Sequence, residues 1–494
     1  MLIAAVVAVV VAANVSSLDV RAGADSRLYS DRAQGFAVRL PRGMEVDTSL
    51  GPVATVISDD RTRVEVFHEL LGPDTVAENY IYYKSRPMRT GVDAVRILDD
   101  RELHSSRWSR IHQLVWTRRP LSRVEVDRRH YATWDFVVGP KEVWSVHVKS
   151  TDPEWALRHG SDVVDSFVVY APTDLPRFRA RQASERAAPL SDAARKAFDH
   201  YFARSARQTW GLFEHGTADS YASLYEIEER LGHRFQVLLE YILIDEVRTP
   251  SILANARREG RLVELTLQLA PPDGAASTEF VYGILDGRWD ADLRRLAREI
   301  AGSQVPVLFR LNNEMNGDWV VYSGYWTSED ADISKETWRY VFRIFQEEGA
   351  TNAIWIWNPH DRSFPPFKYN HAVMYDPGPE YYDVVGMTGY NNGTYYPNET
   401  WRTFDEIYGR IYDEYLVQFP GKPFMIAEFA SSTIGGDKVA WIRNTMDRLS
   451  AYPNIKIAVW WNGIDMDGSV PARPYRLQGD AVMDAFAEGV RHYR

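Results

Sequence analysis

The second half of the chain repeats one pattern, in which a short apolar run ends at polar residues and a longer segment with helical apolar spacing follows. Apolar runs bounded by turn residues are typical of parallel strands that are buried on both faces. We predict eight such strands. They lie at residues 209–214, 235–242, 262–269, 305–311, 353–357, 383–388, 423–427 and 455–460.

Helical patterns follow most of these strands. They lie at residues 220–231, 251–259, 290–301, 334–348, 403–419, 438–449 and 480–490. The connection after the fifth strand, residues 365–382, lacks a long helical pattern. Eight β/α units predict an α/β fold, the (β/α)8 or TIM barrel. A doubly wound parallel sheet is the alternative, and the absence of a Gly-rich phosphate-binding turn disfavours it.

The first part of the chain alternates apolar and polar residues instead, with helical stretches at residues 76–84 and 152–165. This pattern predicts a small α+β domain over residues 27–170. Its opening Gly35-Phe-Ala-Val-Arg-Leu-Pro41 and its closing helix and strand resemble PsbP-like modules. No catalytic group of residues stands out, so we expect an accessory domain that binds or acts as a spacer.

Two further segments complete the predicted domain organisation. Residues 171–190 carry Pro, Arg, Ala, Ser and Glu without apolar periodicity, which indicates a linker, so the barrel domain takes residues 191–494. Residues 2–13 are apolar, too short for a comfortable membrane span, and similar to the core of a secretory signal. No Lys or Arg precedes them. We expect residues 1–26 to direct export, or alternatively to anchor the chain, and the protein to be secreted or associated with the cell envelope.

Charge and composition narrow the classes of partner. A net charge of −11 disfavours nucleic acid and anionic membrane surfaces, so an N-terminal anchor is the only membrane contact that we expect. Zero cysteines exclude disulfides, thiolate metal sites and a Cys nucleophile. We find no metal-binding or phosphate-loop motif and expect no cofactor and no metal. The 16 Trp and 27 Tyr suit contact with sugar rings, although a large barrel also buries many aromatic side chains.

Two carboxylates directly follow apolar strands, Glu314 on the fourth strand and Glu428 on the seventh. The active site of such a barrel lies at the carboxyl ends of its strands, and these two strands lie on roughly opposite sides. Their side chains can approach to the roughly 5–5.5 Å that a retaining glycosidase requires. We predict Glu428 as the nucleophile and Glu314 as the acid/base, which requires the higher pKa for Glu314.

Other side chains at the strand ends are expected to bind the substrate. They are Arg310, Asn313, Trp319, Trp357, Asn358, Tyr390 and Trp461. Within this group we expect Tyr390 to hydrogen-bond the nucleophile, Arg310 to keep its surroundings electropositive and Trp461 to form a floor for the sugar. For His360 both a binding role and a structural role are open, and Glu214, His215 and Glu240 are expected to be structural or peripheral.

Several motifs of the second half resemble glycoside hydrolase family 26, within the clan of retaining (β/α)8 glycosidases. Arg310-Leu-Asn-Asn-Glu-Met-Asn-Gly-Asp-Trp319 is similar to the acid/base segment of that family, and Lys422-Pro-Phe-Met-Ile-Ala-Glu-Phe429 to its seventh strand. Asn352-Ala-Ile-Trp-Ile-Trp-Asn-Pro resembles its fifth strand, and Pro377-Gly-Pro-Glu-Tyr-Tyr-Asp-Val-Val-Gly its sixth. The resemblance implies Glu314 as acid/base and Glu428 as nucleophile. It also implies Trp319, Tyr390 and Trp461 as residues that contact the sugar on the non-reducing side of the cleaved bond.

Two positions depart from the family pattern. Asn313 stands where the family usually has His, and Thr388 stands where its mannanases often carry Asp. The expected activity is therefore a retaining endo-β-glycosidase for a β-linked polysaccharide, with mannan, β-glucan, xylan and exopolysaccharide all open. The alternatives are a non-catalytic carbohydrate-binding barrel and a cell-envelope scaffold.

Overall fold

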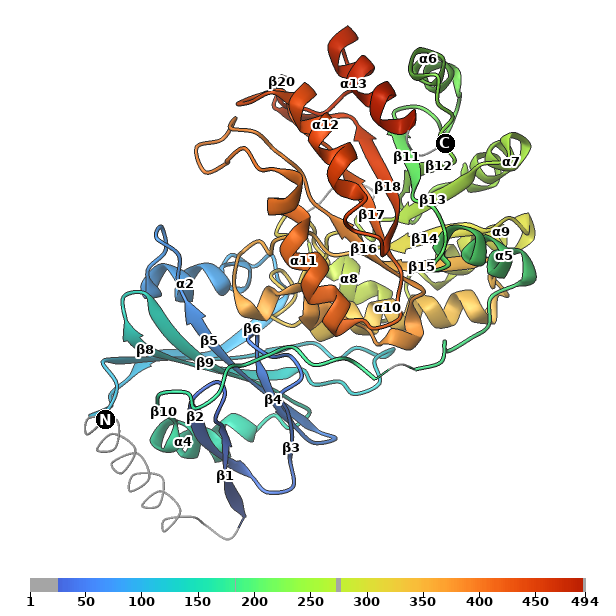
Figure 1. Ribbon diagram of the computed structural model, residues 1–494. Coiled ribbons are helices and arrows are strands. Elements are labelled where there is room, and N and C mark those ends of the chain that lie inside the picture. The colour runs from blue at the N-terminus through green and yellow to red at the C-terminus, as the bar shows by residue number, and fades with distance from the viewer. Residues whose placement is uncertain (1–24, 183, 272–276, 492–494) are drawn as a thin grey trace. The chain divides into compact units, whose positions relative to one another are not determined.

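The computed structural model describes residues 25–182, 184–271 and 277–491. The chain forms two compact units (Figure 1). The first comprises Met1–Arg179 and Phe367–His371, and the second comprises Ala180–Pro366 and Ala372–Arg494. Almost all of the predicted export segment lies outside the described residues. Within the described ranges, no helix combines the length and the apolar character that crossing a membrane requires.

The first unit is β-rich, in agreement with the predicted α+β class. A seven-stranded antiparallel sheet has the order β3 (Glu45–Asp47), β4 (Thr55–Ser58), β5 (Thr62–Leu70), β9 (Glu142–Ser150), β8 (His130–Gly139), β7 (Arg110–Arg118) and β6 (Val95–Leu103). A smaller sheet has the order β1 (Ser26–Asp31), β2 (Phe36–Pro41) and β10 (Val168–Val169). The helices are α2 (Ala77–Lys84), α3 (Arg86–Arg89) and α4 (Trp155–Ser166).

An aromatic core holds this unit together. Phe36, Trp134, Phe136 and Phe167 are all fully buried in one cluster. The sequence pattern does not predict β6, because this edge strand carries a run of charged residues and lies half in solvent. The segment Phe367–His371 also belongs to this unit and contains the 3-10 turn η1 (Lys368–Asn370).

The second unit is a closed barrel of eight parallel strands in chain order, which confirms the predicted (β/α)8 fold (Figure 1). The strands are β11 (Thr209–Glu214), β12 (Val237–Ile242), β13 (Leu262–Leu267), β14 (Val307–Leu311), β15 (Ala353–Trp357), β16 (Val384–Thr388), β17 (Phe424–Phe429) and β18 (Ile455–Asn462). Each strand coincides with a predicted one to within three residues at either end, because apolar residues predominate in each of them.

Helices follow seven of these strands. They are α6 (Ala222–Leu231), α7 (Thr249–Glu259), α8 (Glu279–Ile284) with α9 (Asp290–Ser303), α10 (Ala331–Glu347), α11 (Phe404–Gln418), α12 (Lys438–Leu449) and α13 (Asp480–Val490). The connection from β15 to β16 holds only η1 and the short turns η2 (Ala372–Tyr375) and η3 (Pro379–Tyr381), as predicted. The sequence missed α8, which is too short for a periodic signal, and the hairpin β19 (Ile464–Asp467) and β20 (Val470–Pro474).

Apolar side chains fill most of the barrel interior toward the amino-terminal ends of the strands. Leu308, Ile354, Val384 and Ile457 are fully buried there in one cluster. Ahead of the first strand, α5 (Asp192–Phe202) contributes Ala194 and Phe202 to the same cluster. Two arginines of the predicted linker pair with carboxylates of this unit, Arg181 with Asp376 at 2.9 Å and Arg186 with Asp383 at 2.8 Å.

Candidate active site

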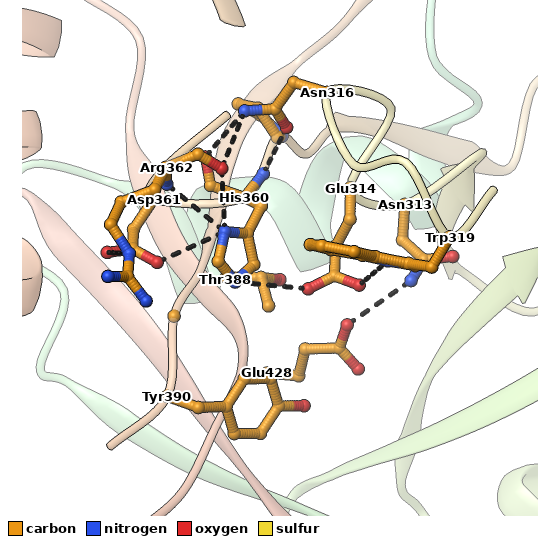
Figure 2. A network of polar contacts seen from close by, with 12 residues as sticks. Asn313, Glu314, Asn316, Trp319, His360, Asp361, Arg362, Thr388, Tyr390 and Glu428 are labelled. Atoms are coloured by element: carbon orange, nitrogen blue, oxygen red, sulfur yellow. Dashed lines mark hydrogen bonds and ion pairs between the residues drawn. The ribbon is translucent and has the colours of Figure 1, made fainter. Parts of the chain in front are cut away.

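Glu428 reaches the mouth of the barrel through an irregularity in β17. The pairing of β17 with β16 shifts just before Glu428, and the pairing with β18 shifts between Ile426 and Phe429. Neighbouring residues of a regular strand point to opposite faces, and a β-bulge changes that direction. Ala427 belongs to the interior cluster, and yet Glu428 also faces inward, toward Glu314 (Figure 2).

Glu314 is held in a strained backbone conformation directly after β14. Its φ is 54° and that of Asn312 is 51°, the left-handed region that side chains other than glycine rarely adopt. The backbone amide of Glu314 donates to the carbonyl of Asn358 at 2.8 Å, and Asn312 Oδ1 accepts from the amide of Leu269 at 3.0 Å. These bonds tie the turn to the ends of β13 and β15. Strain of this kind concentrates at functional sites, where the surrounding structure imposes it.

Glu314 has two close polar neighbours. Trp319 Nε1 donates to Glu314 Oε2 at 3.1 Å, and His360 Nε2 lies 3.9 Å from Glu314 Oε1 (Figure 2). Burial raises the pKa of Glu314, whereas the charge of His360 and the hydrogen bond from Trp319 act against that rise. Burial thus favours the neutral, protonated form of this side chain.

Glu428 has more partners that stabilise a carboxylate. Tyr241 Oη donates to its Oε2, Asn313 Nδ2 donates to its Oε1 at 3.4 Å, and Arg310 Nη1 lies 3.4 Å from the same Oε1. Burial raises the pKa of Glu428 to about 8, and the negative charge of Asp465 acts in the same direction. Burial alone thus does not separate the two carboxyls. The two carboxyls differ in their partners, because a cation, a phenol and an amide contact Glu428.

The amide of Asn313 is oriented by its neighbours. Its Oδ1 accepts from Gln268 Nε2 at 3.0 Å and from Tyr322 Oη at 3.4 Å, which leaves Nδ2 directed at Glu428. Asn313 is buried, so these bonds keep it in one orientation.

Comparison with known proteins locates a family within this barrel. Residues 281–417 match the family model for glycosyl hydrolase family 26. Endoglucanase H of Acetivibrio thermocellus is 31% identical over 186 residues, which cover 36% of this chain and 20% of that protein. A mannan endo-1,4-beta-mannosidase of Bacillus subtilis is 29% identical over 236 residues, which cover 43% of this chain and 59% of that protein. The matched residues thus span less than two thirds of either relative's length.

Over residues 281–417 the barrel is similar to glycoside hydrolase family 26. Among solved structures, the catalytic domain of the endo-beta-1,4-mannanase of Bacillus sp. JAMB-750 aligns with a TM-score of 0.45 and 17% identity. That alignment covers 63% of this chain and 93% of the solved chain.

Aromatic side chains line the site beside the two carboxyls. Trp461 stacks on Phe213 with ring centroids 5.3 Å apart and meets Tyr390 edge-on at 6.3 Å. Tyr390 packs on Tyr475 at 4.9 Å. Trp319 is 49% exposed, so its ring is available to a ligand. The structure therefore brings the predicted residues Trp319, Tyr390 and Trp461 together with Asn313 at one mouth.

We predicted a hydrogen bond from Tyr390 to Glu428, but the structure has a hydrogen bond from Tyr241 to Glu428 instead. Among the described residues, the hydroxyl that contacts Glu428 is that of Tyr241, which precedes the last residue of β12. The sequence signal for Tyr241 was its place at a strand end. Gln268 was missed because the predicted strand 262–269 runs past it, whereas β13 ends at Leu267. Tyr475 was missed because it does not follow a predicted strand of the barrel.

Three predicted substrate-binding residues do not reach the opening. Trp357 is fully buried and packs on Tyr382 and Phe419, outside the barrel interior, because it precedes the inward-facing Asn358 by one residue. Asn358 is fully buried too, and its Oδ1 accepts from Arg310 and from Thr388 Oγ1. Arg310 is equally inaccessible. Asn358 and Arg310 therefore support the site from below instead of touching a ligand.

The turn that carries Glu314 is tied to the loop after β15. Asn316 Nδ2 donates to the carbonyl of His360 at 3.1 Å, and Asn316 Oδ1 accepts from the amide of His360 at 2.8 Å (Figure 2). His360 Nδ1 lies 3.3 Å from Asp361, whose carboxylate pairs with Arg402. This network fixes the imidazole that faces Glu314.

A cavity of about 230 Å³ adjoins the site. It is lined by Tyr241 and Ile242 of β12, by Gln268, and by Leu243, Asp245, Glu246 and Arg248 of the loop after β12. It shares Tyr241 and Gln268 with the network around Glu428. In the described ranges of the chain, no three His, Cys, Asp or Glu side chains are arranged to hold a metal ion.

Proposed function

We propose that the barrel is a retaining endo-β-glycosidase that cleaves a β-linked polysaccharide by double displacement. The observation that carries this proposal is the pair of buried carboxyls, Glu314 and Glu428, which face each other from β14 and β17 with different partners. The likeness to family 26 and the names of the relatives, an endoglucanase and a mannan endo-1,4-beta-mannosidase, support a β-glycan as substrate.

In the first step Glu428 is ionised and attacks the anomeric carbon, so that an ester bond forms between its oxygen and the sugar. Arg310 and Tyr241 stabilise the carboxylate before the attack. Glu314 donates its proton to the glycosidic oxygen as the bond to the leaving sugar breaks. The first product leaves with that proton, and Glu314 is left as a carboxylate.

In the second step Glu314 removes a proton from water, and the resulting oxygen attacks the same carbon. The ester bond breaks, Glu428 leaves as a carboxylate, and Glu314 carries a proton again. Two inversions at one carbon give net retention of configuration. His360, fixed by Asp361 and Asn316, is placed to stabilise Glu314 while it is negatively charged.

The remaining residues of the mouth bind the sugar. Asn313 directs its amide into the space between the two carboxyls, where a hydroxyl of the reacting ring would lie. Trp319, Tyr390 and Trp461 offer aromatic faces on which the apolar faces of sugar rings pack. The proposed substrate is one of four polysaccharides, namely mannan, β-glucan, xylan or an exopolysaccharide.

Thr388, one of the two residues that depart from the family pattern, acts on the site indirectly. Thr388 is fully buried, and its hydroxyl bonds to Asn358, which also holds Arg310. We infer that Thr388 supports Arg310, and that Asn313 bears more directly on the choice of sugar because its amide faces the reacting centre. The protein is secreted or held at the cell envelope in this proposal, and residues 27–170 form an accessory domain joined to the barrel by residues 171–190.

The experiment that tests this function is a hydrolysis screen on β-mannan, β-1,3/1,4-glucan, β-1,3-xylan and the exopolysaccharide of the producing organism. Released reducing ends are compared between the wild type and the double variant Glu314→Gln/Glu428→Gln. We expect one substrate to be cleaved by the wild type alone. Binding of a glycan without any cleavage would support a non-catalytic carbohydrate-binding barrel instead.

A further inference from the structure

A third buried carboxyl lies inside the barrel and has no part in the two steps above. Glu264 is in the middle of β13 and is fully buried. The neighbours that it pairs with on the adjacent strands, Leu239 and Leu308, are apolar and fully buried. Replacing a buried ion pair by packed apolar residues is often neutral or stabilising, so the stability of the barrel does not account for a glutamate at this position.

The contact of Glu264 with the rest of the protein is electrostatic. Its Oε1 lies 3.1 Å from Arg310 Nε, but the proton on that nitrogen is directed to Thr266 Oγ1 at 2.7 Å. Within the described residues, neither oxygen of Glu264 has a hydrogen-bond partner. The position of this carboxyl is therefore defined by the positive charge of Arg310.

Arg310 lies between two carboxyls. Its Nε side faces Glu264, and its Nη1 lies 3.4 Å from Glu428 Oε1 and donates to Asn358 Oδ1 at 2.9 Å. All three charged side chains are almost completely buried. One guanidinium cannot neutralise two carboxylates fully at low dielectric, so ionisation of either acid disfavours ionisation of the other.

We propose that Glu264 is a positioning residue that acts through Arg310 to set the pH at which the nucleophile Glu428 ionises. This inference rests on the proposed function, because it assigns Glu428 the role of nucleophile. While Glu264 is neutral, the whole charge of Arg310 is available to Glu428. While Glu428 is bound to the sugar and uncharged, Glu264 is the carboxyl that remains to pair with Arg310 inside the barrel.

The charges around the pair are consistent with this assignment. Burial raises the pKa of Glu264 to about 7 and that of Glu428 to about 8, so both titrate over the same range. Arg310 opposes the rise at Glu264. Other ionisable groups in the described part of the chain that face the pair include Tyr241 on β12, with its ring 5.5 Å from the Arg310 guanidinium carbon, and Asp465 on β19. Glu314 and Tyr322 after β14 and Tyr390 after β16 also face it.

The test is the pH dependence of kcat/KM for Glu264→Gln on the substrate found in the screen. The acid limb of the profile reports the ionisation of Glu428 in the free enzyme. Removing the competing carboxyl should move that limb to lower pH by about one unit, while the basic limb, which reports Glu314, stays in place. A merely structural role for Glu264 would lower activity at every pH without moving the limb, and that result would overturn the proposal.

Glu240→Gln is the matched control. Glu240 is also a buried carboxyl, on the neighbouring strand β12, and burial raises its pKa to about 7. Its partners are Thr217 and Arg248, not Arg310. We expect the profile of this variant to keep the acid limb of the wild type. If Glu264→Gln does not fold, Glu264→Met, which has a similar volume and suits the apolar interior, should give the same shift.

A second readout separates failure of this inference from failure of the proposed function. The titration of Glu428 in the resting protein is followed by NMR of chains with 13C-labelled glutamate carboxyls, assigned with Glu428→Gln. A lower titration midpoint for Glu428 in Glu264→Gln supports the coupling even if no glycan is hydrolysed. An unchanged midpoint overturns the coupling even if the enzyme is active.

Discussion

Glu314 and Glu428 are chemically identical side chains that receive different surroundings. Arg310, Tyr241 and Asn313 contact Glu428, whereas Glu314 has one indole donor and a facing imidazole. A cation and two donors stabilise a carboxylate, and burial with few donors stabilises the neutral acid. The assignment of nucleophile and acid rests on this difference and not on the depth of burial, which both share.

Glu314→Gln tests the acid role. The variant cannot protonate the leaving oxygen, so cleavage of substrates with poor leaving groups should slow by about 10²- to 10⁴-fold. Substrates that carry a good leaving group, such as dinitrophenyl glycosides, need no such proton and should be slowed far less in the first step. Steady-state and burst kinetics on the two substrate types are the measurement. Equal slowing of the first step for both would contradict the assignment.

Glu428→Gln tests whether burial raises the pKa of Glu428, because a raised pKa makes the free energy of unfolding depend on pH. The pKa of Glu428 in the folded protein, about 8, lies above its ordinary value of 4.5, so the folded state binds the proton more tightly than the unfolded chain does. Its contribution to stability is complete below pH 4.5 and is lost as the pH rises toward 8.

The variant has no such loss, so it should match the wild type at pH 4 and exceed it at pH 8 by on the order of a few kcal/mol in unfolding free energy. Denaturant unfolding at both pH values measures this. A constant difference between the two proteins would show that Glu428 ionises with an ordinary pKa.

At the scale of elements, the sequence predicted which residues end the strands but not where each side chain points. The apolar runs located Glu314 and Glu428 because run length alone marks the end of a buried strand. The direction of a side chain depends on the strand register and on β-bulges, and the sequence pattern does not predict either of them. Trp357 therefore turned out to pack outside the barrel, Glu428 is directed by a shift in pairing, and Tyr241 replaced Tyr390 as the partner of the nucleophile.

The ends of α7 and α9 offer a matched test of backbone strain away from the site. Both helices end at a left-handed residue, which is Gly260 in α7 with φ 61° and Gln304 in α9 with φ 54°. Gln304→Gly should stabilise the protein and Gly260→Ala should destabilise it, each by about 1 kcal/mol. A Cβ on Gly260 would meet no atom within 4 Å, so conformation alone is tested. Thermal unfolding should show opposite shifts with unchanged hydrolysis, and shifts of the same sign would contradict the strain argument.

At the scale of the whole molecule, the proposed reaction uses residues of one of the two units. Every residue assigned to the reaction lies within Ala180–Pro366 or Ala372–Arg494, and the first unit has its own aromatic core. The sequence predicted both fold classes, since alternation and apolar runs differ clearly between the two halves. It did not predict that Phe367–His371 belongs to the first unit, because that membership depends on tertiary contacts such as the ring of Phe367 on that of Tyr80 at 4.6 Å.

A chain that begins at Ala180 tests this division. It keeps Arg181 and Arg186 with their partners Asp376 and Asp383. We expect hydrolysis of soluble oligosaccharides within about threefold of the full chain, because no residue of the mouth is removed. Phe367→Ala in the full chain is the control for the lost contact with Tyr80. Loss of activity in the soluble, folded truncated chain but not in the control would mean that the first unit takes part in the reaction.

The most direct test of the central claim is azide rescue of Glu428→Ala on an activated aryl glycoside of the sugar identified in the screen. Without its nucleophile the variant should show no turnover, while azide, small enough to enter the space left by the carboxylate, should restore part of it. The product should be a glycosyl azide whose anomeric configuration is opposite to that of the substrate, since only one displacement occurs. Substantial turnover by Glu428→Ala without azide, or a glycosyl azide of retained configuration, would contradict the account.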